Sequence, residues 1–347
     1  MKSAAEKKTI HDNDPVDRVN RVASQASIVE HNPTIILAPL RGITDALFRQ
    51  LLQKHFGGLD SALAPFINPQ QKAPFDDRLL RDVLPEANRS LGITPQILHT
   101  EAEGFLTLAR RLTDLGYQEI NWNLGCPAPM VTRKKRGSGL LPYPDEILAF
   151  LDQVIPRLQV RLSIKTRLGL EQNTELQDLL PRLDDYPLTG ITIHARLGRQ
   201  LYKGQCDLET FERCLALSRH PITYNGDITS RAIFHDMHQR FPGIQSWMIG
   251  RGLISNPFLA QEIRGTKLTP DERHEQLHNF HQALYTSYKE RLAGPSHLLG
   301  RMKLIWSYLA MSFANREKVF KRIRKANTEE QYLAVVEDVF IENLIGA

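Results

Sequence analysis

The segments LSIKT (Leu162–Thr166) and GITIH (Gly190–His194) are two of eight short β-rich runs that recur along the chain. Amphipathic stretches with apolar residues at three- and four-residue spacing lie between such runs. Eight β-then-α units over about 230 residues fit a closed parallel barrel better than an open doubly wound sheet. The other predicted strands are Ile35–Ala38, Ser61–Ala64, Thr94–Leu98, Gln118–Asn123, Ile222–Asn225 and Ser246–Gly250.

The pattern changes after Gly265, where long helical periodicities follow and no strand is predicted. The fold class expected is therefore α/β, a (β/α)₈ TIM barrel followed by a small C-terminal all-helical domain. We predict a flexible N-terminal tail at residues 1–32, the barrel at 33–267 and the helical domain at 268–347. The predicted helices include Glu101–Leu115, Asp145–Leu158 and Ser230–Arg240 in the barrel, and Glu272–Arg291, Ser296–Phe313 and Glu329–Ile345 after it.

Composition argues for a cytoplasmic protein. Hydrophobic residues make up 41% of the 347, and no apolar run approaches the roughly eighteen residues of a membrane span. The first twenty residues have no apolar core, which argues against a secretory signal. Three cysteines without CxxC spacing indicate neither a disulfide framework nor a metal site. The excess of basic residues is concentrated at Arg133–Arg136 and Lys321–Lys325.

Polar residues gather where the predicted strands end. In a parallel barrel these ends open onto one shared mouth, so their side chains are the candidate site. They are Pro39, Leu40 and Arg41 after the first strand, Gln96 on the third, Asn123 and Cys126 at the fourth, Lys165 and Arg167 at the fifth, His194 and Arg196 at the sixth, Asn225, Gly226 and Asp227 at the seventh, and Gly250, Arg251 and Gly252 at the eighth.

These residues suggest flavin mononucleotide (FMN). Lys165 alternates with apolar residues and would point into the barrel, where an ammonium stabilises the negative charge of reduced flavin. Gly226, Gly250 and Arg251 could cradle a phosphate. No Rossmann GxGxxG follows a strand, so a tightly held dinucleotide is not expected. Simpler interpretations are a structural salt bridge for Lys165, a core position for His194, a loop cap for Gln96 and turn formation for the glycines.

Motifs in order along the chain resemble those of the tRNA-dihydrouridine synthases. The resemblance extends from about residue 35 into the helical tail, and the tail and Tyr202 look closest to the branch that includes the bacterial synthase C type. Leu40 and Asn121 depart from the usual Met and Asp. The motifs are APLRG (38–42), PQI (95–97), NLGCP (123–127), GSGLL (137–141), IKTRLG (164–169), IHAR (193–196), YNGDI (224–228), IGRG (249–252) and RMKLIWSYL (301–309).

The resemblance implies that NADPH reduces bound FMN, which passes hydride from N5 to C6 of a uracil in tRNA. Cys126, as a neutral thiol, would then protonate C5 from the opposite face. A small structural hydrophobe is the alternative for this cysteine. The residues expected to bind FMN are Pro39, Leu40, Arg41, Gln96, Lys165, Arg167, His194, Asn225, Gly226, Asp227, Gly250 and Arg251.

A stacked uridine must be flipped out to reach such a barrel, which gives the helical tail a role in holding tRNA. By the resemblance, Asn123 would bind the uracil and Tyr202 would contact the RNA. Arg301, Lys303 and Lys321 are expected to meet phosphates, although a solvated helix face would also explain them. Arg133–Arg136 could contact the backbone near the target base.

Two other functions fit the sequence less well. An FMN barrel reductase for a free pyrimidine or an enone would not bind tRNA in a salt-sensitive way. An inactive RNA-binding barrel would carry no yellow cofactor, and the set Cys126, Lys165, Asn225 and Arg251 argues against it. A monomer is expected, and which uridine is reduced depends on how the tail orients the tRNA.

Overall fold

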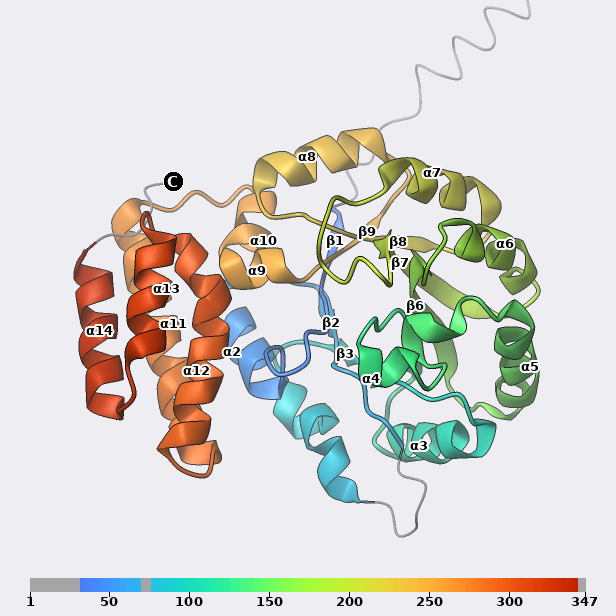
Figure 1. The fold of residues 1–347 in the computed structure, drawn as a ribbon, viewed down its shortest axis with the longest axis horizontal. Helices are drawn as coiled ribbons and strands as arrows, with labels where there is room; N and C mark the ends of the chain where they lie inside the picture. The colour runs from blue at the N-terminus through green and yellow to red at the C-terminus, as the bar shows by residue number, and fades with distance from the viewer. Residues whose placement is uncertain (1–31, 70–75, 343–347) are drawn as a thin grey trace, which may run out of the picture. The chain divides into compact units, whose positions relative to one another are not determined.

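A computed structural model describes residues 32–69 and 76–342, and its strands are all parallel (Figure 1). The expected tail at 1–32 lies outside the described residues apart from Asn32. All eight predicted strands are present, and the fifth and sixth run on to Gly169 and Leu197. The strands are β1 (Thr34–Leu37), β2 (Ser61–Leu63), β3 (Ile93–Thr94), β4 (Gln96–Ile97), β5 (Glu119–Leu124), β6 (Arg161–Gly169), β7 (Leu188–Leu197), β8 (Ile222–Asn225) and β9 (Ser246–Ile249).

The sheet closes through a proline. The strand order is β3-β2-β1-β9-β8-β7-β6-β5-β4, so the two ends of the sheet are β3 and β4. These two short strands are consecutive in sequence and are separated only by Pro95. Proline has no N–H to donate to a ladder, so the third predicted strand is divided at this residue. Together β3 and β4 act as one strand, which gives the eight-stranded barrel that the sequence predicts.

Helices surround the barrel, and side chains of the preceding loops cap three of the α-helices described there, α2, α7 and α8. Asp45 accepts a hydrogen bond from Phe48 N at the start of α2, and Ser230 accepts one from Ile233 N at the start of α8. Between β2 and β3 the described residues form the short 3₁₀ helices η1 (Asp77–Val83) and η2 (Pro85–Asn88), where a regular unit would have an α-helix. The barrel helices are α2 (Ala46–Phe56), α3 (Ala102–Asp114), α4 (Pro129–Thr132), α5 (Pro144–Val154), α6 (Thr174–Leu183), α7 (Leu208–Leu217), α8 (Arg231–Arg240), α9 (Arg251–Ser255) and α10 (Leu259–Ile263), with the 3₁₀ turns η3 (Gly137–Leu140) and η4 (Ile155–Arg157).

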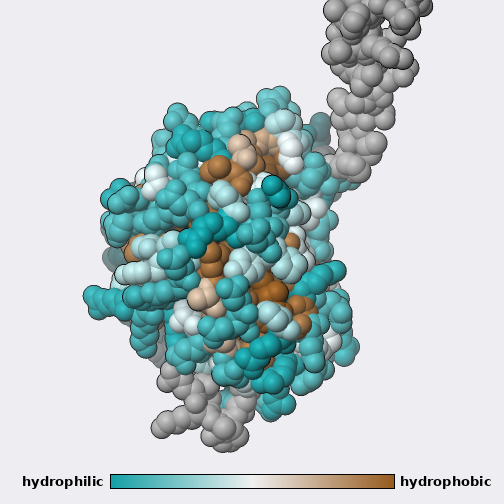
Figure 2. All heavy atoms as spheres, turned by 90° about the vertical axis from the view of Figure 1, so that its right-hand side faces the viewer, coloured by the Kyte–Doolittle hydropathy of each residue, from teal (hydrophilic) through white to brown (hydrophobic). Residues whose placement is uncertain are grey.

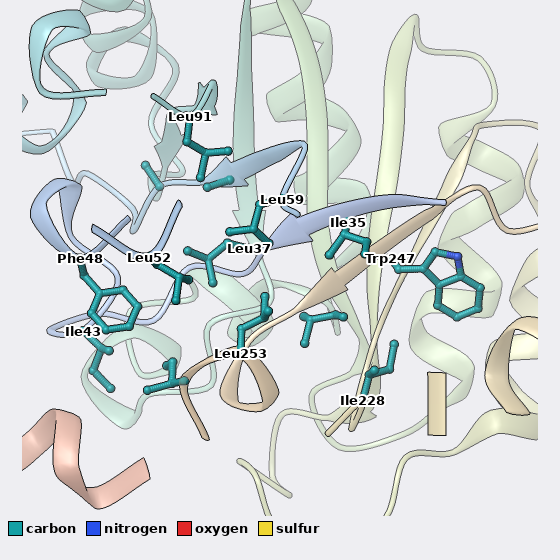
Figure 3. Close-up of a cluster of buried hydrophobic side chains, with 14 of the residues drawn as sticks. Ile35, Leu37, Ile43, Phe48, Leu52, Leu59, Leu91, Ile228, Trp247 and Leu253 are labelled. Carbon is teal, nitrogen blue, oxygen red and sulfur yellow. The ribbon is translucent and has the colours of Figure 1, made fainter. Parts of the chain in front are cut away.

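The core lies between the strands and these helices. Figure 3 shows one part of it, where Ile35 and Leu37 of β1 and Trp247 of β9 are fully buried. Phe48 and Leu52 of α2 close the same cluster and are about 1% exposed. Burying such side chains stabilises the fold by about 1.5–3 kcal/mol each. The barrel wall is therefore fixed by apolar packing, which leaves the strand ends free to carry polar groups.

In the described residues after the barrel, up to position 342, there are four helices and one 3₁₀ turn. Thr269 and Glu272 form a reciprocal capping box at the start of the first helix, so it begins where the pattern predicts. A separate helix at the basic run near Lys321 was not predicted from the sequence. The elements are α11 (Pro270–Arg291), α12 (Pro295–Leu309), η5 (Ala310–Ser312), α13 (Arg316–Lys325) and α14 (Glu329–Ile341).

Aromatic packing joins the helical region to α2 of the barrel. The Phe280 ring on α11 meets the rings of Phe48 and Phe56 edge to face, at centroid distances of 5.8 and 5.0 Å. Tyr288 Oη donates to Asp45 Oδ1 at 2.8 Å. Residues from Pro33 onward form one compact unit, and the division at residue 267 stays a prediction.

The outer surface of the barrel is mainly hydrophilic on the side that carries α5 and α6, with smaller apolar patches between (Figure 2). Among the described residues, none of the helices has the length and apolar character needed to cross a membrane.

Candidate active site

The carboxyl ends of the strands open onto a cavity of about 100 Å³, which a second cavity of about 50 Å³ extends. Pro39, Lys165, His194 and Tyr202 line both. Nearly all the predicted strand-end residues meet here. The first cavity is also lined by Arg41, Pro65, Phe66, Gln96, Asn123, Gly125, Cys126, Pro127 and Arg167, and the second by Ala38, Leu40, Asn225, Gly226, Gly250 and Arg251.

The loop that carries Cys126 is held by its backbone. Asn123 Oδ1 accepts hydrogen bonds from Cys126 N at 2.8 Å and from Gly125 N at 3.1 Å. Ser138 donates to the Cys126 carbonyl from its backbone N at 3.1 Å and from Oγ at 3.2 Å. Arg167 Nε donates to the Gly125 carbonyl at 3.0 Å. The sulfur-bearing residue is therefore fixed in place by three separate segments.

Gly137 allows the GSGLL segment (137–141) to pack directly against the Cys126 carbonyl. It has φ 57°, and a Cβ built on it would lie 2.6 Å from the Cys126 carbonyl oxygen. A larger residue would be strained and would push the cysteine loop away. The small residues of this segment thus serve the position of Cys126.

The Cys126 thiol is free, partly buried and protonated at neutral pH. Burial raises its pKa, and this effect outweighs the hydrogen bond from Ala128 N and the nearby cations Arg167 and Arg41, which lower it. A neutral thiol can donate a proton, whereas a nucleophile would need the thiolate. The environment therefore favours an acid at this position.

A cationic group faces the thiol across the cavity. Lys165 Nζ donates to Asn225 Oδ1 at 2.8 Å, which is an amide and carries no charge. Asn225 is held in turn by donating from Nδ2 to the Met248 carbonyl at 2.7 Å. Burial, and secondarily the charge of Arg167, lower the pKa of Lys165 to about 7. An anionic ligand would restore the charged ammonium.

His194 is buried beside this lysine and is neutral. Burial lowers its pKa well below the usual value, and Arg167, Lys165 and other neighbouring cations lower it further. Its Nε2 lies 3.3 Å from Arg196 Nη1. A guanidinium can only donate, so His194 accepts at Nε2 and carries its proton on Nδ1.

Asp227 organises the far end of the cavity without lining it. Its carboxylate pairs with Arg196 through both oxygens and with Arg251 Nη2 at 2.7 Å. Gly226 lies so close to the Tyr224 hydroxyl that a Cβ would collide with it. Gly226, Gly250 and Arg251 line this end of the cavity.

Comparisons with known proteins agree with this geometry. The model of the dihydrouridine synthase family, described as "Dihydrouridine synthase (Dus)", matches residues 36–344. The chain belongs to this family. The tRNA-dihydrouridine(16) synthase of Neisseria meningitidis serogroup B is 26% identical over 307 residues, which cover 86% of this chain and 92% of the relative. The tRNA-dihydrouridine synthase B of Escherichia coli K12 is 30% identical over 236 residues, covering 66% and 71%.

Among solved structures, histamine dehydrogenase from Rhizobium sp. 4-9 superposes with a TM-score of 0.50. The match has 11% sequence identity and covers 68% of this chain and 47% of that one. At this identity the likeness shows a shared barrel fold and nothing about the chemistry.

Tyr202 stands at the mouth of the cavity of this dihydrouridine synthase family member. The side chain is about half exposed, and its ring lies 4.9 Å from the Arg251 guanidinium carbon and 5.5 Å from that of Arg167. Such cation–π contacts hold the ring over the opening. Tyr202 is thus placed where a ligand would enter.

Sequence reasoning missed Pro65 and Phe66, which follow β2 and line the first cavity. Arg41 lies over the Phe66 ring at 5.5 Å. Both directly follow the predicted strand Ser61–Ala64, but they are apolar, so a pattern of polar strand ends does not mark them. A neighbouring cavity of about 600 Å³ shares Arg41, Pro65 and Phe66 and is also lined by Met130, Arg133, Lys134 and Arg136. The basic run therefore borders the site.

Three predicted RNA contacts lie outside the cavity. Arg301 was expected to face phosphate, but it pairs with Asp45 and lies over the Tyr288 ring at 5.0 Å. Its side chain is 22% exposed, and this pair links α12 to α2. A phosphate contact by Arg301 stays a prediction. Lys303 is half-buried on α12 and Lys321 is exposed on α13. For these two an RNA contact stays a prediction.

Proposed function

We propose that the chain reduces uridine in tRNA to 5,6-dihydrouridine, with FMN as cofactor and NADPH as reductant. The observation that carries the proposal is the placement of a protonated thiol, Cys126, in the same cavity as Lys165. Family membership gives the substrate class, since the named relatives are tRNA-dihydrouridine synthases.

The residues of the cavity fit FMN. A buried ammonium whose hydrogen bond goes to an amide leaves positive charge for an anionic ring system, and Lys165 supplies it. Gln96, Arg167, His194 and Asn225 would surround the ring, with Pro39, Leu40 and Arg41 along one side. Gly226, Gly250 and Arg251 would hold the phosphate, and Asp227 would orient Arg251. When bound, FMN supplies hydride transfer.

The protein supplies the proton and holds the base. Cys126 would donate the proton of Sγ to C5 of the uracil, and burial keeps that proton on sulfur at neutral pH. Asn123 uses its oxygen for the cysteine loop, so it would offer the uracil an N–H and bind a carbonyl. These contacts would fix the base with C5 toward the thiol.

The tRNA must present the uridine outside its stack. Tyr202 at the mouth, Arg133, Lys134 and Arg136 beside the cavity, and Lys303 and Lys321 on the helical region would hold the surrounding RNA. Cations that extend from the cavity to the helical region suit the sugar-phosphate backbone of an RNA better than a free pyrimidine.

The test incubates purified protein with FMN, NADPH and an unmodified tRNA transcript, and measures dihydrouridine by mass spectrometry of the digested RNA. We expect dihydrouridine at defined positions with the native chain and almost none with Cys126→Ala. Rapid reduction of free uracil or an enone, at a rate that added tRNA does not lower, would instead identify a small-molecule reductase.

A further inference from the structure

Three buried amide side chains join the cysteine loop to the floor of the barrel. Asn123 Nδ2 donates to Gln96 Oε1 at 2.8 Å, and Gln96 Nε2 donates to Asn121 Oδ1 at 2.7 Å. Asn121 Nδ2 then donates to Ser163 Oγ at 3.0 Å. The exposed fractions of Gln96, Asn121 and Asn123 are 0%, 2% and 7%, so this amide relay lies almost entirely inside the barrel.

The backbone sets the direction of the amide relay. The N–H groups of Gly125 and Cys126 can only donate, so Asn123 must turn its oxygen toward the loop. Its NH₂ group then faces Gln96, which must present an oxygen and turn its own NH₂ toward Asn121. Asn121 then turns its NH₂ toward Ser163 Oγ. The Ser163 hydroxyl accepts this bond and donates its own hydrogen to the Ile120 carbonyl at 3.4 Å. Every amide therefore has one orientation.

The two ends of the relay belong to different cavities. Asn123 and Gln96 line the active-site cavity, whereas Asn121 and Ser163 line a separate cavity of about 180 Å³. This 180 Å³ floor cavity is bordered by Ser61, Ser246 and Thr223, from the amino-terminal parts of the strands. Gln96 and Asn123 carry the side-chain hydrogen bonds that lead from Asn121 to the site.

We propose that Asn121 is a positioning residue for Cys126. It supplies the acceptor that orients Gln96, and Gln96 orients Asn123, which holds the cysteine loop by two backbone N–H groups. A buried amide that loses its partner is free to turn or must draw in water, and either change loosens the next member of the relay. Removing the acceptor at position 121 should therefore release the Cys126 loop while leaving the cavity wall intact.

The test compares Asn121→Leu with Asn121→Asp. Leucine has a similar size and no acceptor, whereas aspartate still accepts from Gln96 Nε2 and can accept from the Ser163 hydroxyl. Thr192→Val is the matched control, because Thr192 lines the same floor cavity and lies outside the amide relay. The first readout is the rate of Cys126 alkylation by iodoacetamide in protein without cofactor, followed by mass spectrometry.

With Asn121→Leu we expect Cys126 to be alkylated roughly 5- to 10-fold faster at constant pH, because a released loop exposes the sulfur and relieves the burial that raises its pKa. The kcat for tRNA should fall roughly 10- to 100-fold, while the rate of flavin reduction by NADPH, measured at saturating FMN, changes little. Asn121→Asp and Thr192→Val should stay close to the native chain in every readout.

Native alkylation and turnover in Asn121→Leu would overturn the inference, as would equal damage in Asn121→Asp. Should Asn121→Leu not fold, Ser163→Ala removes the terminal acceptor of the relay and should shift alkylation in the same direction by a smaller factor; an unchanged rate there would also overturn it. The turnover arm rests on the proposed function and the alkylation arm does not. A native chain that makes no dihydrouridine would refute the function and leave the relay to be judged by alkylation.

Discussion

Lys165 Nζ on β6 donates a hydrogen bond to Asn225 Oδ1 on β8 at 2.8 Å, across the intervening strand β7. This contact ties the middle of the barrel mouth to the end that is lined by Gly226, Gly250 and Arg251. Burial, and secondarily the charge of Arg167, lower the pKa of this amine to about 7, and its hydrogen-bond acceptor is a neutral amide. The site is therefore arranged to gain a proton when an anion binds.

Binding of FMN to the apoprotein near pH 8 should be accompanied by proton uptake. The amine is mostly neutral there, and an adjacent anion raises its pKa so that it becomes charged. Calorimetry in buffers of different ionisation enthalpy measures the uptake. In Lys165→Met the uptake should be smaller by about one proton per FMN bound. Any proton uptake by the FMN phosphate should remain. Equal uptake in both proteins would show that this lysine does not titrate on binding.

Replacing the thiol should separate the two halves of the reaction. Cys126→Ala should keep FMN and its reduction by NADPH, and lose about 10²- to 10⁴-fold in turnover on tRNA because the proton donor is gone. Cys126→Ser is the matched variant and should retain slightly more activity, since a hydroxyl is a weaker acid of similar size. Single-turnover reoxidation of reduced enzyme by tRNA gives the rates. Full activity in Cys126→Ala would exclude the acid role.

Adding one methyl group at Gly137 should disturb the cysteine loop. Gly137→Ala combines a left-handed backbone with a collision at the Cys126 carbonyl, so we expect lower stability and at least about 10-fold lower turnover. Gly116 has φ 92° with nothing within 4 Å of a Cβ, which makes Gly116→Ala the control. That control should lose only about 1–2 kcal/mol of stability. Thermal unfolding and turnover are measured on both; similar turnover in the two variants would contradict the argument.

Arg301→Ala should destabilise the protein by about 1–3 kcal/mol, because it leaves Asp45 without its buried cationic partner at the junction of α12 and α2. Thermal or urea unfolding measures the loss. Arg301→Lys should recover part of it, since lysine keeps the charge without the planar fork. If the variant unfolds like the native chain but binds tRNA weakly, the original RNA assignment would be correct.

Lys321→Ala should show the opposite behaviour. This exposed lysine on α13 is expected to meet a phosphate, so its removal should weaken tRNA binding and reduce the slope of log affinity against log salt by about one. The melting temperature should not change. Titrations at several salt concentrations give the slope, and an unchanged slope would place Lys321 outside the RNA interface.

The sequence predicted the parts of the site that lie at strand ends. Lys165, His194 and Asn225 converge because parallel strands bring their carboxyl ends to one rim, so strand assignment alone places them together. Phe66 was missed because it is apolar, and only polar residues at strand ends mark the site in the sequence. The pairing of Arg301 with Asp45 was not predicted, because a basic residue on an amphipathic helix looks the same whether it faces solvent or a carboxylate 256 positions away in the chain.

By itself the sequence determined the barrel and the helical tail, because hydrophobic periodicity and short motifs are local properties of the chain. It also predicted Cys126 as the acid, through a resemblance of short motifs. Only the tertiary structure decided what holds Cys126 in place. The relay from Asn121 through Gln96 to Asn123 joins strands whose residues lie 25 and 27 positions apart, and its direction depends on which backbone groups face which side chains. Hydrogen-bond direction is a property of packed neighbours, and no local pattern encodes it.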